Sequence, residues 1–229
     1  MKYRYHGSAE TAIVTTVGEV DYTEGVARWE PNASGRLTEA AMALFAERGY
    51  AKTTVGEIAE RAGLTERTFF NHFTDKREVL FAGSEQFSRQ IVDAARAAPK
   101  AQAPLDVVLS AYQSMNDFFE ARRAFARKRS ELIAGQPELQ ERELIKMMTV
   151  AAAIIEVLKQ RGTSASSASL AAETASAIFR VGFEQWAQDP KNRSLTLHLR
   201  AARRQLEGVI NQARSRGSAR RRRARSVRR

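Results

Sequence analysis

The sequence predicts an all-α protein in which a small three-helix unit is followed by a larger helical domain. Three helical patterns and two tight turns occupy residues 35–80, and apolar residues then recur at helical spacing, with Pro, Gly and Ser between the runs. A chain of 229 residues with 43% hydrophobic residues has room for two modest domains or one large one.

The first thirty residues differ from the rest of the chain. They mix β-branched residues with three glycines and carry a slight acidic excess, and the Pro31 that follows them suits the first turn of a helix. We expect a flexible N-terminal arm over 1–30. The alternatives are a short strand or a basic arm around Lys2 and Arg4, which the acidic excess disfavours.

The middle of the three-helix unit carries the signals of two short helices joined by a tight turn. Thr54 and Glu57 form a Thr-x-x-Glu capping box, in which hydroxyl and carboxylate satisfy free amide hydrogens at a helix start. Gly63 provides the backbone freedom of a C-terminal cap, and Thr65 caps the next helix. Because the connection is only three or four residues long, the two helices cannot lie parallel, and the sequence predicts a helix-turn-helix over 54–73.

The helix that begins at Thr65 sorts its side chains into three rows. Phe69 and Phe73 lie four residues apart and are expected to point inward. A polar row offers hydrogen-bond donors to DNA phosphates, and it consists of Thr65, Thr68, His72 and Lys76. The last row is free to address base edges in a major groove, and it consists of Glu66, Arg67, Phe70 and Asn71. A buried or capping His72, and a solvated pair of Glu66 with Arg67, are the alternatives.

Three stretches of this unit carry a family pattern. They are Ala-Ala-x-x-Leu-Phe-x-x-x-Gly-Tyr over 40–50, Thr-Thr-Val-x-x-Ile-Ala-x-x-Ala-Gly over 53–63, and a third helix that ends His72-Phe73 before Lys76. With them the unit resembles the DNA-binding domain of the TetR family of bacterial transcriptional regulators. Residues and resemblance together predict DNA contacts at Thr54, Thr65, Glu66, Arg67, Thr68, Phe70, Asn71, His72 and Lys76.

Two positions depart from the family pattern. Phe70 stands where the family usually has Tyr, so the phenolic hydrogen bond is absent. Gly56 offers only backbone where some relatives use a long side chain that contacts bases. We therefore expect base readout to come from the third helix.

Six further helices are predicted, over 75–97, 104–120, 123–134, 137–161, 169–188 and 194–214. We accordingly expect a DNA-binding domain over 31–91 and a helical effector-binding and dimerisation domain over 92–213. The last two helices carry apolar stripes longer than one small domain needs, and TetR-like proteins form dimers through their final two helices. The predicted dimer contacts are Ile178, Trp186, Leu199, Leu206 and Ile210.

A second apolar stripe is rich in aromatic and methionine side chains, which can line an adaptable ligand cavity or simply form core. The predicted ligand pocket consists of Phe87, Ile91, Tyr112, Met115, Phe119, Met147 and Ile155. The segment 121–148, with the apolar run 150–158 and the tetrapeptide 183–186, is similar to the C-terminal domain of the mycofactocin-system regulators. That resemblance implies an acyl-CoA ligand, whose phosphates the cations of 122–129 would suit; an exposed amphipathic helix explains those cations equally.

The last sixteen residues, 214–229, contain nine arginines and no acid, so they account for nine of the eleven net positive charges. A block of like charges repels itself, and we expect a disordered Arg-rich tail. It either raises DNA affinity by counterion release or is dispensable. The segment 31–80 is itself balanced, with seven basic and seven acidic residues.

Several classes of protein are disfavoured. No stretch approaches the roughly 20 apolar residues of a membrane span, and the first residues lack the apolar core of a secretory signal, so we expect a cytoplasmic protein. Cysteine is absent and the three histidines are scattered, so we expect no metal and no cofactor. No nucleophile elbow, histidine pair or phosphate loop occurs, and we expect no catalytic residues and no enzyme.

These observations predict a ligand-responsive repressor that binds a near-palindromic DNA operator as a homodimer and is released by a small apolar or acyl-CoA-like effector. The alternative is a nonspecific architectural DNA-binding protein driven by the Arg-rich tail.

Overall fold

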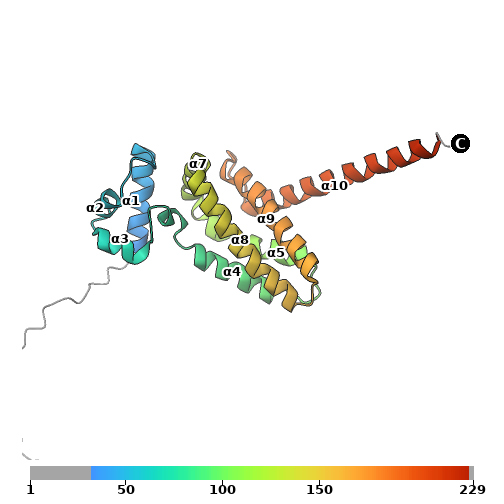
Figure 1. Ribbon diagram of the computed structural model, residues 1–229, viewed down its shortest axis with the longest axis horizontal. Coiled ribbons are helices and arrows are strands. Elements are labelled where there is room, and N and C mark those ends of the chain that lie inside the picture. The colour runs from blue at the N-terminus through green and yellow to red at the C-terminus, as the bar shows by residue number, and fades with distance from the viewer. Residues whose placement is uncertain (1–31, 227–229) are drawn as a thin grey trace, which may run out of the picture. The chain divides into compact units, whose positions relative to one another are not determined.

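The structure, a computed structural model, describes the backbone of residues 32–226 and the side chains of residues 32–212 (Figure 1). Its elements are α1 (Ala33–Arg48), α2 (Val55–Arg61), α3 (Glu66–His72), the 3₁₀ helix η1 (Glu78–Phe81), α4 (Ser84–Ala97), α5 (Pro104–Gln113), α6 (Asn116–Glu120), α7 (Arg123–Ala134), α8 (Pro137–Gln160), α9 (Ala165–Ala187) and α10 (Leu195–Ser226). No strand occurs in this part of the chain, and the predicted all-α fold is confirmed. The arm expected over 1–30 lies outside the described residues.

The elements α1, α2, α3 and η1, here called the N-terminal helices, pack around one apolar cluster. Its centre consists of Leu37 and Phe45 of α1, Ile58 of α2 and Phe69 of α3, all buried. Burial of a side chain of this size favours folding by about 1.5–3 kcal/mol. The cluster therefore holds together helices of seven residues, which are too short to be stable alone.

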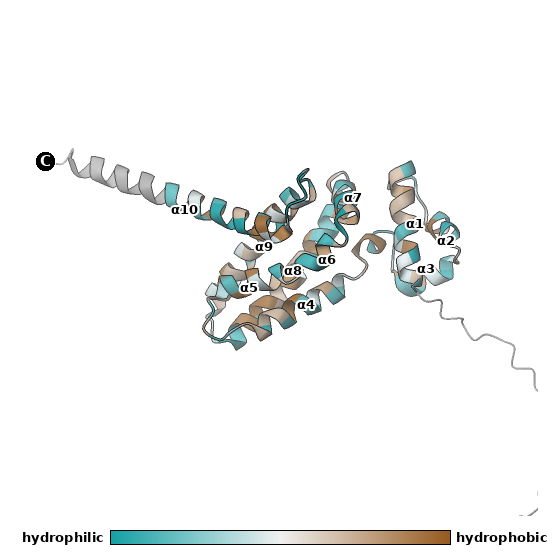
Figure 2. Ribbon diagram, turned by 180° about the vertical axis from the view of Figure 1, so that it is seen from behind, coloured by the Kyte–Doolittle hydropathy of each residue, from teal (hydrophilic) through white to brown (hydrophobic). Residues whose placement is uncertain are grey.

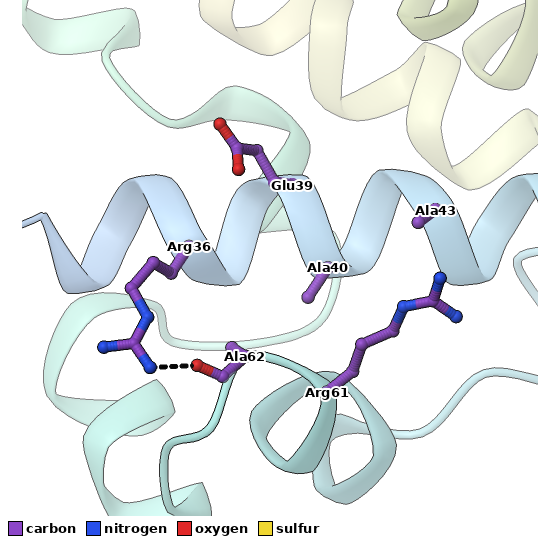
Figure 3. A pocket seen from close by; sticks show the side chains of 6 residues that line it. All are labelled: Arg36, Glu39, Ala40, Ala43, Arg61 and Ala62. Carbon is purple, nitrogen blue, oxygen red and sulfur yellow. Dashed lines mark hydrogen bonds between the residues drawn. The ribbon is translucent and has the colours of Figure 1, made fainter.

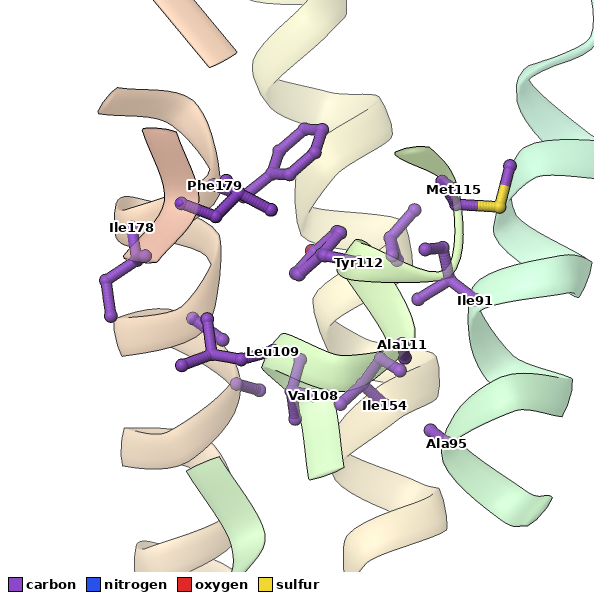
Figure 4. Packing of buried hydrophobic residues seen from close by; sticks show 14 of the residues in the cluster. Ile91, Ala95, Val108, Leu109, Ala111, Tyr112, Met115, Ile154, Ile178 and Phe179 are labelled. Carbon is purple, nitrogen blue, oxygen red and sulfur yellow. The ribbon is translucent and has the colours of Figure 1, made fainter. Parts of the chain in front are cut away.

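The helices α4–α10, here called the C-terminal helices, pack around a second cluster. The helix α9 lies at its centre and packs against α5, α8 and α10. Figure 4 shows Phe179 of α9 on the same side as Tyr112 of α5, and Ile154 of α8 belongs to the same cluster. Figure 2 shows apolar and polar residues on the same helices, which is the pattern of helices that bury one face. No helix within the described residues is both long enough and apolar enough to span a membrane.

Two of the predicted helices are interrupted. The one expected over 75–97 is divided into η1 and α4 by Ala82 and Gly83, and Gly83 adopts a left-handed φ of 79°. The break lets η1 bury Val79, Leu80 and Phe81 among the N-terminal helices, because a straight continuation could not turn all three inward.

The helix expected over 104–120 is divided into α5 and α6 at Ser114. The Ser114 hydroxyl donates to the Ala111 carbonyl at 2.7 Å, and such bonds compete with the helical ladder. The prediction for α7 agrees with the structure, α8 ends one residue earlier than expected, and α9 begins four residues earlier, because Ser164 caps it.

The tail also differs from its prediction. The backbone of α10 remains helical as far as Ser226, where disorder was expected from 214 onward. Arginine and alanine both have high helix propensity, and no proline interrupts 195–226, so local propensity outweighs the repulsion between like charges. Residues 227–229 lie outside the described part.

One helix belongs to both clusters. Leu139, in the first turn of α8, is buried with the N-terminal helices, together with Ile133 of α7. Further along α8, Ile154 and Leu158 are buried in the second cluster. The two groups of helices therefore share α8 as a structural member.

Candidate nucleic-acid interface

The capping box at the start of α2 is present as predicted. The Thr54 hydroxyl accepts the Glu57 amide at 3.2 Å, and the Glu57 carboxylate accepts the Thr54 amide at 2.8 Å. The amide of Thr54, its hydroxyl and the nearby Arg48 together hold the pKa of the Glu57 carboxyl below its ordinary value. Both polar groups of Thr54 are thus used inside the cap.

The turn between α2 and α3 depends on one glycine for two reasons. Gly63 has a φ of 65°, which side chains with a Cβ rarely adopt. A Cβ at this position would also lie 2.9 Å from Nη2 of Arg36. That nitrogen donates to the Ala62 carbonyl at 2.5 Å and so satisfies the C-terminus of α2 from α1.

A shallow pocket of about 290 Å³ lies beside this contact, on α1 and α2 (Figure 3). It is lined by Arg36, Glu39, Ala40, Ala43, Arg61 and Ala62. Two bonds of 2.6 and 2.7 Å join Arg61 to Glu47, and Arg36 bonds Ala62 as Figure 3 shows. We assign no ligand to this pocket, because its cations already have partners.

The third helix buries one row of side chains and exposes another. Phe69 and Phe73 are buried, and their rings lie 5.4 Å apart, as expected. The exposed residues of the helix are Glu66, Arg67, Phe70, Asn71 and His72, with 54% of Phe70 exposed. The buried pair thus holds α3 so that the row predicted to address bases faces outward, and His72 is not a core histidine.

Glu66 has a neighbour that the sequence did not predict. A Cβ at Gly56 would lie 2.5 Å from Oε1 of Glu66, so the carboxylate rests against the first turn of α2. The absence of a side chain at Gly56 makes room for it. A side chain at position 56 would therefore displace the Glu66 carboxylate from this place.

The predicted row of phosphate donors is only partly assembled. The hydroxyls of Thr65 and Thr68 lie 2.9 Å apart, and Thr65 also accepts the Thr68 amide at 3.1 Å. Lys76 differs from the prediction, because its Nζ donates to the carbonyls of Tyr50 and Thr53 at 2.8 and 2.9 Å. It also lies 4.2 Å from the centre of the Tyr50 ring, so Lys76 braces the loop between α1 and α2.

The seven residues of the predicted ligand pocket lie in one cluster of the C-terminal helices. Ile91, Tyr112 and Met115 are buried in it. The others pack against it partly buried, and they are Phe87, Phe119, Met147 and Ile155. All seven residues therefore belong to one core cluster, and a ligand pocket among them remains a prediction.

The aromatic part of that cluster includes side chains of α9 that sequence reasoning missed. Phe179 stacks on Tyr112, with ring centres 4.4 Å apart. Phe183 and Trp186 approach Phe119 at 5.1 and 6.0 Å. Their spacing at i, i+4 and i+7 was the available signal, but α9 was expected to face a second subunit.

Three of the predicted dimer contacts are wrong. Ile178, Trp186 and Leu199 are 3%, 0% and 1% exposed, so they belong to the interior of one subunit. The reason is that α9 lies at the centre of the C-terminal helices, where α5, α8 and α10 of the same subunit cover its apolar stripe. Leu206 is partly buried at the edge of the cluster, and Ile210 is exposed. The large apolar side chains exposed on α9 and α10 are Leu170, Leu197, Val209 and Ile210.

The start of α10 is fixed by side chains from α6. Glu120 accepts the Leu195 amide at 2.8 Å and the indole of Trp186 at 2.9 Å. Arg123 bonds the other oxygen of Glu120 at 2.6 Å and lies 4.5 Å from the centre of the Trp186 ring. These contacts tie the aromatic cluster to the first turn of α10.

The turn before α10 is fixed by a buried carboxylate. Asp189 accepts the guanidinium and the amide of Arg193, and its pKa is lowered by these bonds and by the Lys191 amide. His198 completes the arrangement with Nε2 at 3.1 Å from the carboxylate. Further along, Arg203 pairs with Asp106 of α5.

Two family models match the chain. Residues 37–82 match the model described as bacterial regulatory proteins, tetR family, and residues 102–211 match the MftR C-terminal domain. Residues 37–82 are thus similar to the TetR family, and residues 102–211 to the C-terminal domain of MftR. Both predicted resemblances are thereby confirmed, the second of them for most of the C-terminal helices.

Three curated transcriptional regulators are similar to the chain over part of their length. The chain is 32% identical to TcmR of Streptomyces glaucescens over 35% of each chain. It is 46% identical to the repressor KstR2 of Mycobacterium tuberculosis over 20% of this chain and 23% of KstR2. It is 26% identical to MftR of Mycobacterium tuberculosis over 50% of this chain and 58% of MftR. The chain thus spans about a quarter to three fifths of these relatives.

Solved structures of the same fold cover more of the chain. The complex of SmeT with triclosan matches 74% of this chain and 89% of SmeT, with a TM-score of 0.54 and 20% identity. The fatty acid degradation regulator FadR of Bacillus halodurans matches 76% and 93%, with a TM-score of 0.51 and 16% identity. At such identities the similarity shows the fold.

Proposed function

We propose that this protein is a sequence-specific DNA-binding transcriptional regulator of the TetR family that acts as a homodimer. The observation that carries the proposal is the exposed row of α3, in which Arg67 and Asn71 stand on a face held outward by buried Phe69. Arginine pairs well with guanine, and asparagine with adenine, in a major groove. The relatives TcmR and KstR2 are named as a transcriptional regulator and a transcriptional repressor.

The charge of the N-terminal helices favours specific over nonspecific binding. Seven basic and seven acidic residues over 31–80 give no net attraction for phosphates. Glu66, exposed on the same face as Arg67, would repel a phosphate brought close to it. Affinity for DNA must then come from well-placed contacts, which is what a base-reading helix supplies.

The subunit face proposed for dimerisation is the exposed side of α9 and α10. Leu197 and Val209 of α10 are large apolar side chains that are 51% and 65% exposed on one subunit. Two subunits joined there would place two copies of α3 in successive major grooves, about 34–36 Å apart, on a near-palindromic operator. Repression follows if such a site overlaps a promoter.

The effector is proposed to be a small apolar molecule that binds among the aromatic side chains of α4, α6 and α9. Phe87, Phe119 and Phe183 are only partly buried there, so a ligand can reach them. An acyl-CoA also fits, because exposed Arg122 lies 4.5 Å from the centre of the Phe118 ring and could meet a phosphate. Release requires that the ligand bind the form unsuited to DNA more tightly.

The test is selection of duplexes from a random library by the purified full-length protein, followed by fluorescence anisotropy on the selected duplex and its single-base variants. We expect a near-palindrome to be enriched. Arg67→Ala should cost about 1–3 kcal/mol of affinity and relax the preference at one base pair of each half-site. Equal losses on every base variant would mean that Arg67 contacts phosphate only. Native mass spectrometry of the same sample would show a dimer and any co-purified ligand.

The second candidate function, nonspecific architectural binding, is favoured by the nine arginines of 214–229. Truncation after Gln212 separates the two candidates. If the tail only supplies phosphate contacts, affinity falls for operator and random duplex alike, and each lost contact flattens the slope of log affinity against log salt by about 0.9. Loss of all DNA binding, with no preference in the full-length protein, would favour the architectural function.

A further inference from the structure

We propose that Glu78 is a positioning residue for operator recognition, because it fastens the N-terminal helices to α8. In this arrangement α8, and not α4, sets where the third helix lies. A role in operator recognition presupposes the proposed DNA-binding function. The role of Glu78 in fixing the N-terminal helices follows from contacts between η1, α7 and α8, which are independent of that function.

The first contact is apolar. The corner between α7 and α8 inserts Ile133 and Leu139 into the cluster that holds Leu37 and Phe45. Both inserted side chains are almost fully buried, at 3% and 0% exposed. The core beneath the third helix is therefore completed by residues that follow it by more than sixty positions in the sequence.

The second contact is ionic. The Glu78 carboxylate, whose side chain is 14% exposed, lies between two cations of α8. Arg142 bonds one carboxylate oxygen, and Nζ of Lys146 lies 3.0 Å from the other. The two cations stand one helical turn apart, so a single carboxylate from η1 pairs with both.

A third contact comes from α7. The guanidinium of Arg129 donates to the Leu80 carbonyl of η1 at 2.8 Å and to Glu143 of α8 at 2.8 Å. It also lies 4.9 Å from the centre of the Phe81 ring. Arg129 thus joins η1, α7 and α8 through one side chain and leaves the Glu78 pair little freedom to rotate.

The covalent link through α4 is weaker as a mechanical connection. Ala82 and Gly83 stand between η1 and α4, and the left-handed Gly83 can absorb a change of direction. The helix α8 has no such break over 24 residues, a length of about 36 Å. Its far half contributes Ile154 to the cluster in which the effector is proposed to bind. A shift of α8 would therefore move the N-terminal helices through Glu78, while α4 bends at Gly83.

The effect of removing the carboxylate follows from its surroundings. Glu78→Gln keeps the size and shape of the side chain but removes its negative charge. Arg142 and Lys146 are then partly buried cations that repel each other. The apolar contacts of Ile133 and Leu139 remain, so the variant should fold. What it loses is a unique orientation of η1 on α8.

The matched control is Glu85→Gln. Glu85 is also acidic and lies seven residues further on, but its side chain is 85% exposed and pairs with Arg89 on the same helix. It has no contact with α8 that could fix the N-terminal helices. Any general effect of removing one negative charge will appear in both variants.

The first experiment measures geometry without DNA. The chain has no cysteine, so Ala46→Cys on α1 and Gln160→Cys on α8, both exposed, can carry spin labels without interference. Doubly labelled protein diluted with unlabelled protein reports the distance within one subunit by pulsed electron paramagnetic resonance. We expect a broader distance distribution in Glu78→Gln and an unchanged one in Glu85→Gln. An unchanged distribution in Glu78→Gln overturns the inference, whatever the protein does with DNA.

The second experiment measures recognition on the duplex selected by the wild-type protein and on the same duplex with one half-site scrambled. A positioning role predicts that Glu78→Gln loses about tenfold or more in affinity for the intact duplex and less than about twofold for the half-site duplex. Glu78→Gln with Arg142→Gln should be no weaker than Glu78→Gln alone, because the two residues act through one contact. Equal losses on both duplexes, with a lowered Tm, would assign Glu78 a purely structural role and overturn the inference. A wild-type protein that selects no duplex refutes the proposed function, and the distance measurement still decides whether Glu78 fixes the N-terminal helices.

Discussion

The turn between α2 and α3 and the junction between α9 and α10 are both tightly fixed, but by contacts of different range. In the first, Thr54 and Thr65 each accept an amide three residues along, and Arg36 of α1 adds one bond from 26 residues away. In the second, Glu120 holds the Leu195 amide from 75 residues away. Contacts of the first kind join residues that are close in the sequence and can be predicted from it. Contacts of the second kind join residues that are far apart in the sequence and form only when the chain folds. Stability tests should therefore give local losses in one region and cooperative losses in the other.

The largest expected change in the free energy of unfolding comes from the buried side chains that hold α3 in place. Phe69→Ala removes a fully buried ring from the N-terminal helices and should lower the free energy of unfolding by about 3–5 kcal/mol. Phe70→Ala removes the same ring one position along, where 54% of it is exposed, and should cost within about 0.5 kcal/mol. Urea unfolding followed by circular dichroism measures both. Similar losses in the two variants would contradict the assignment of faces on α3.

Next in size is a matched pair on α10. Leu199→Ala should destabilise the subunit by about 2–5 kcal/mol, because the side chain is 1% exposed and packs against α9. Leu197→Glu should leave the subunit folded but weaken the dimer, since Leu197 is exposed on the proposed interface. Analytical ultracentrifugation with thermal unfolding separates the outcomes. A Leu199→Ala protein that unfolds normally but sediments as a monomer would restore Leu199 to the interface.

The smallest expected effect concerns the cap of α2. Thr54→Ala should cost about 1 kcal/mol near neutral pH, as loss of an N-cap usually does. The pKa of Glu57 is lowered in the folded protein, so its contribution is fully present above its ordinary value of 4.5 and is lost as the pH falls further. The difference in unfolding free energy between wild type and Thr54→Ala should therefore shrink in acid. A difference that grows below pH 4.5 would show that Glu57 does not act through this cap.

The same difference in range explains what the sequence could predict. The capping box, the turn and the buried pair Phe69 and Phe73 followed from spacing alone, and the structure agrees with each. The exposure of Arg67 followed from the same periodicity, although its contact with DNA remains a prediction.

The failures share one physical cause. An apolar stripe on α9 shows that a face is buried but not what buries it, so Ile178 and Trp186 were assigned to a partner subunit. The contact of Lys76 with DNA remains a prediction, and its bonds to two carbonyls 23 and 26 residues away were not visible in the sequence. The same distance in sequence hid the contact of Glu78 with α8.

The insertion of Ile133 and Leu139 beneath the first three helices bears on hybrid regulators, in which one protein's sensor is joined to another's operator preference. A hybrid that takes only residues up to 91 from this protein would have an incomplete core around its N-terminal helices. Two buried side chains of that core, Ile133 and Leu139, would be missing from the hybrid. A junction that keeps the N-terminal helices with a matching α7–α8 corner would preserve both the packing and the charges of Glu78, Arg142 and Lys146. In this protein the portable unit is therefore discontinuous along the chain.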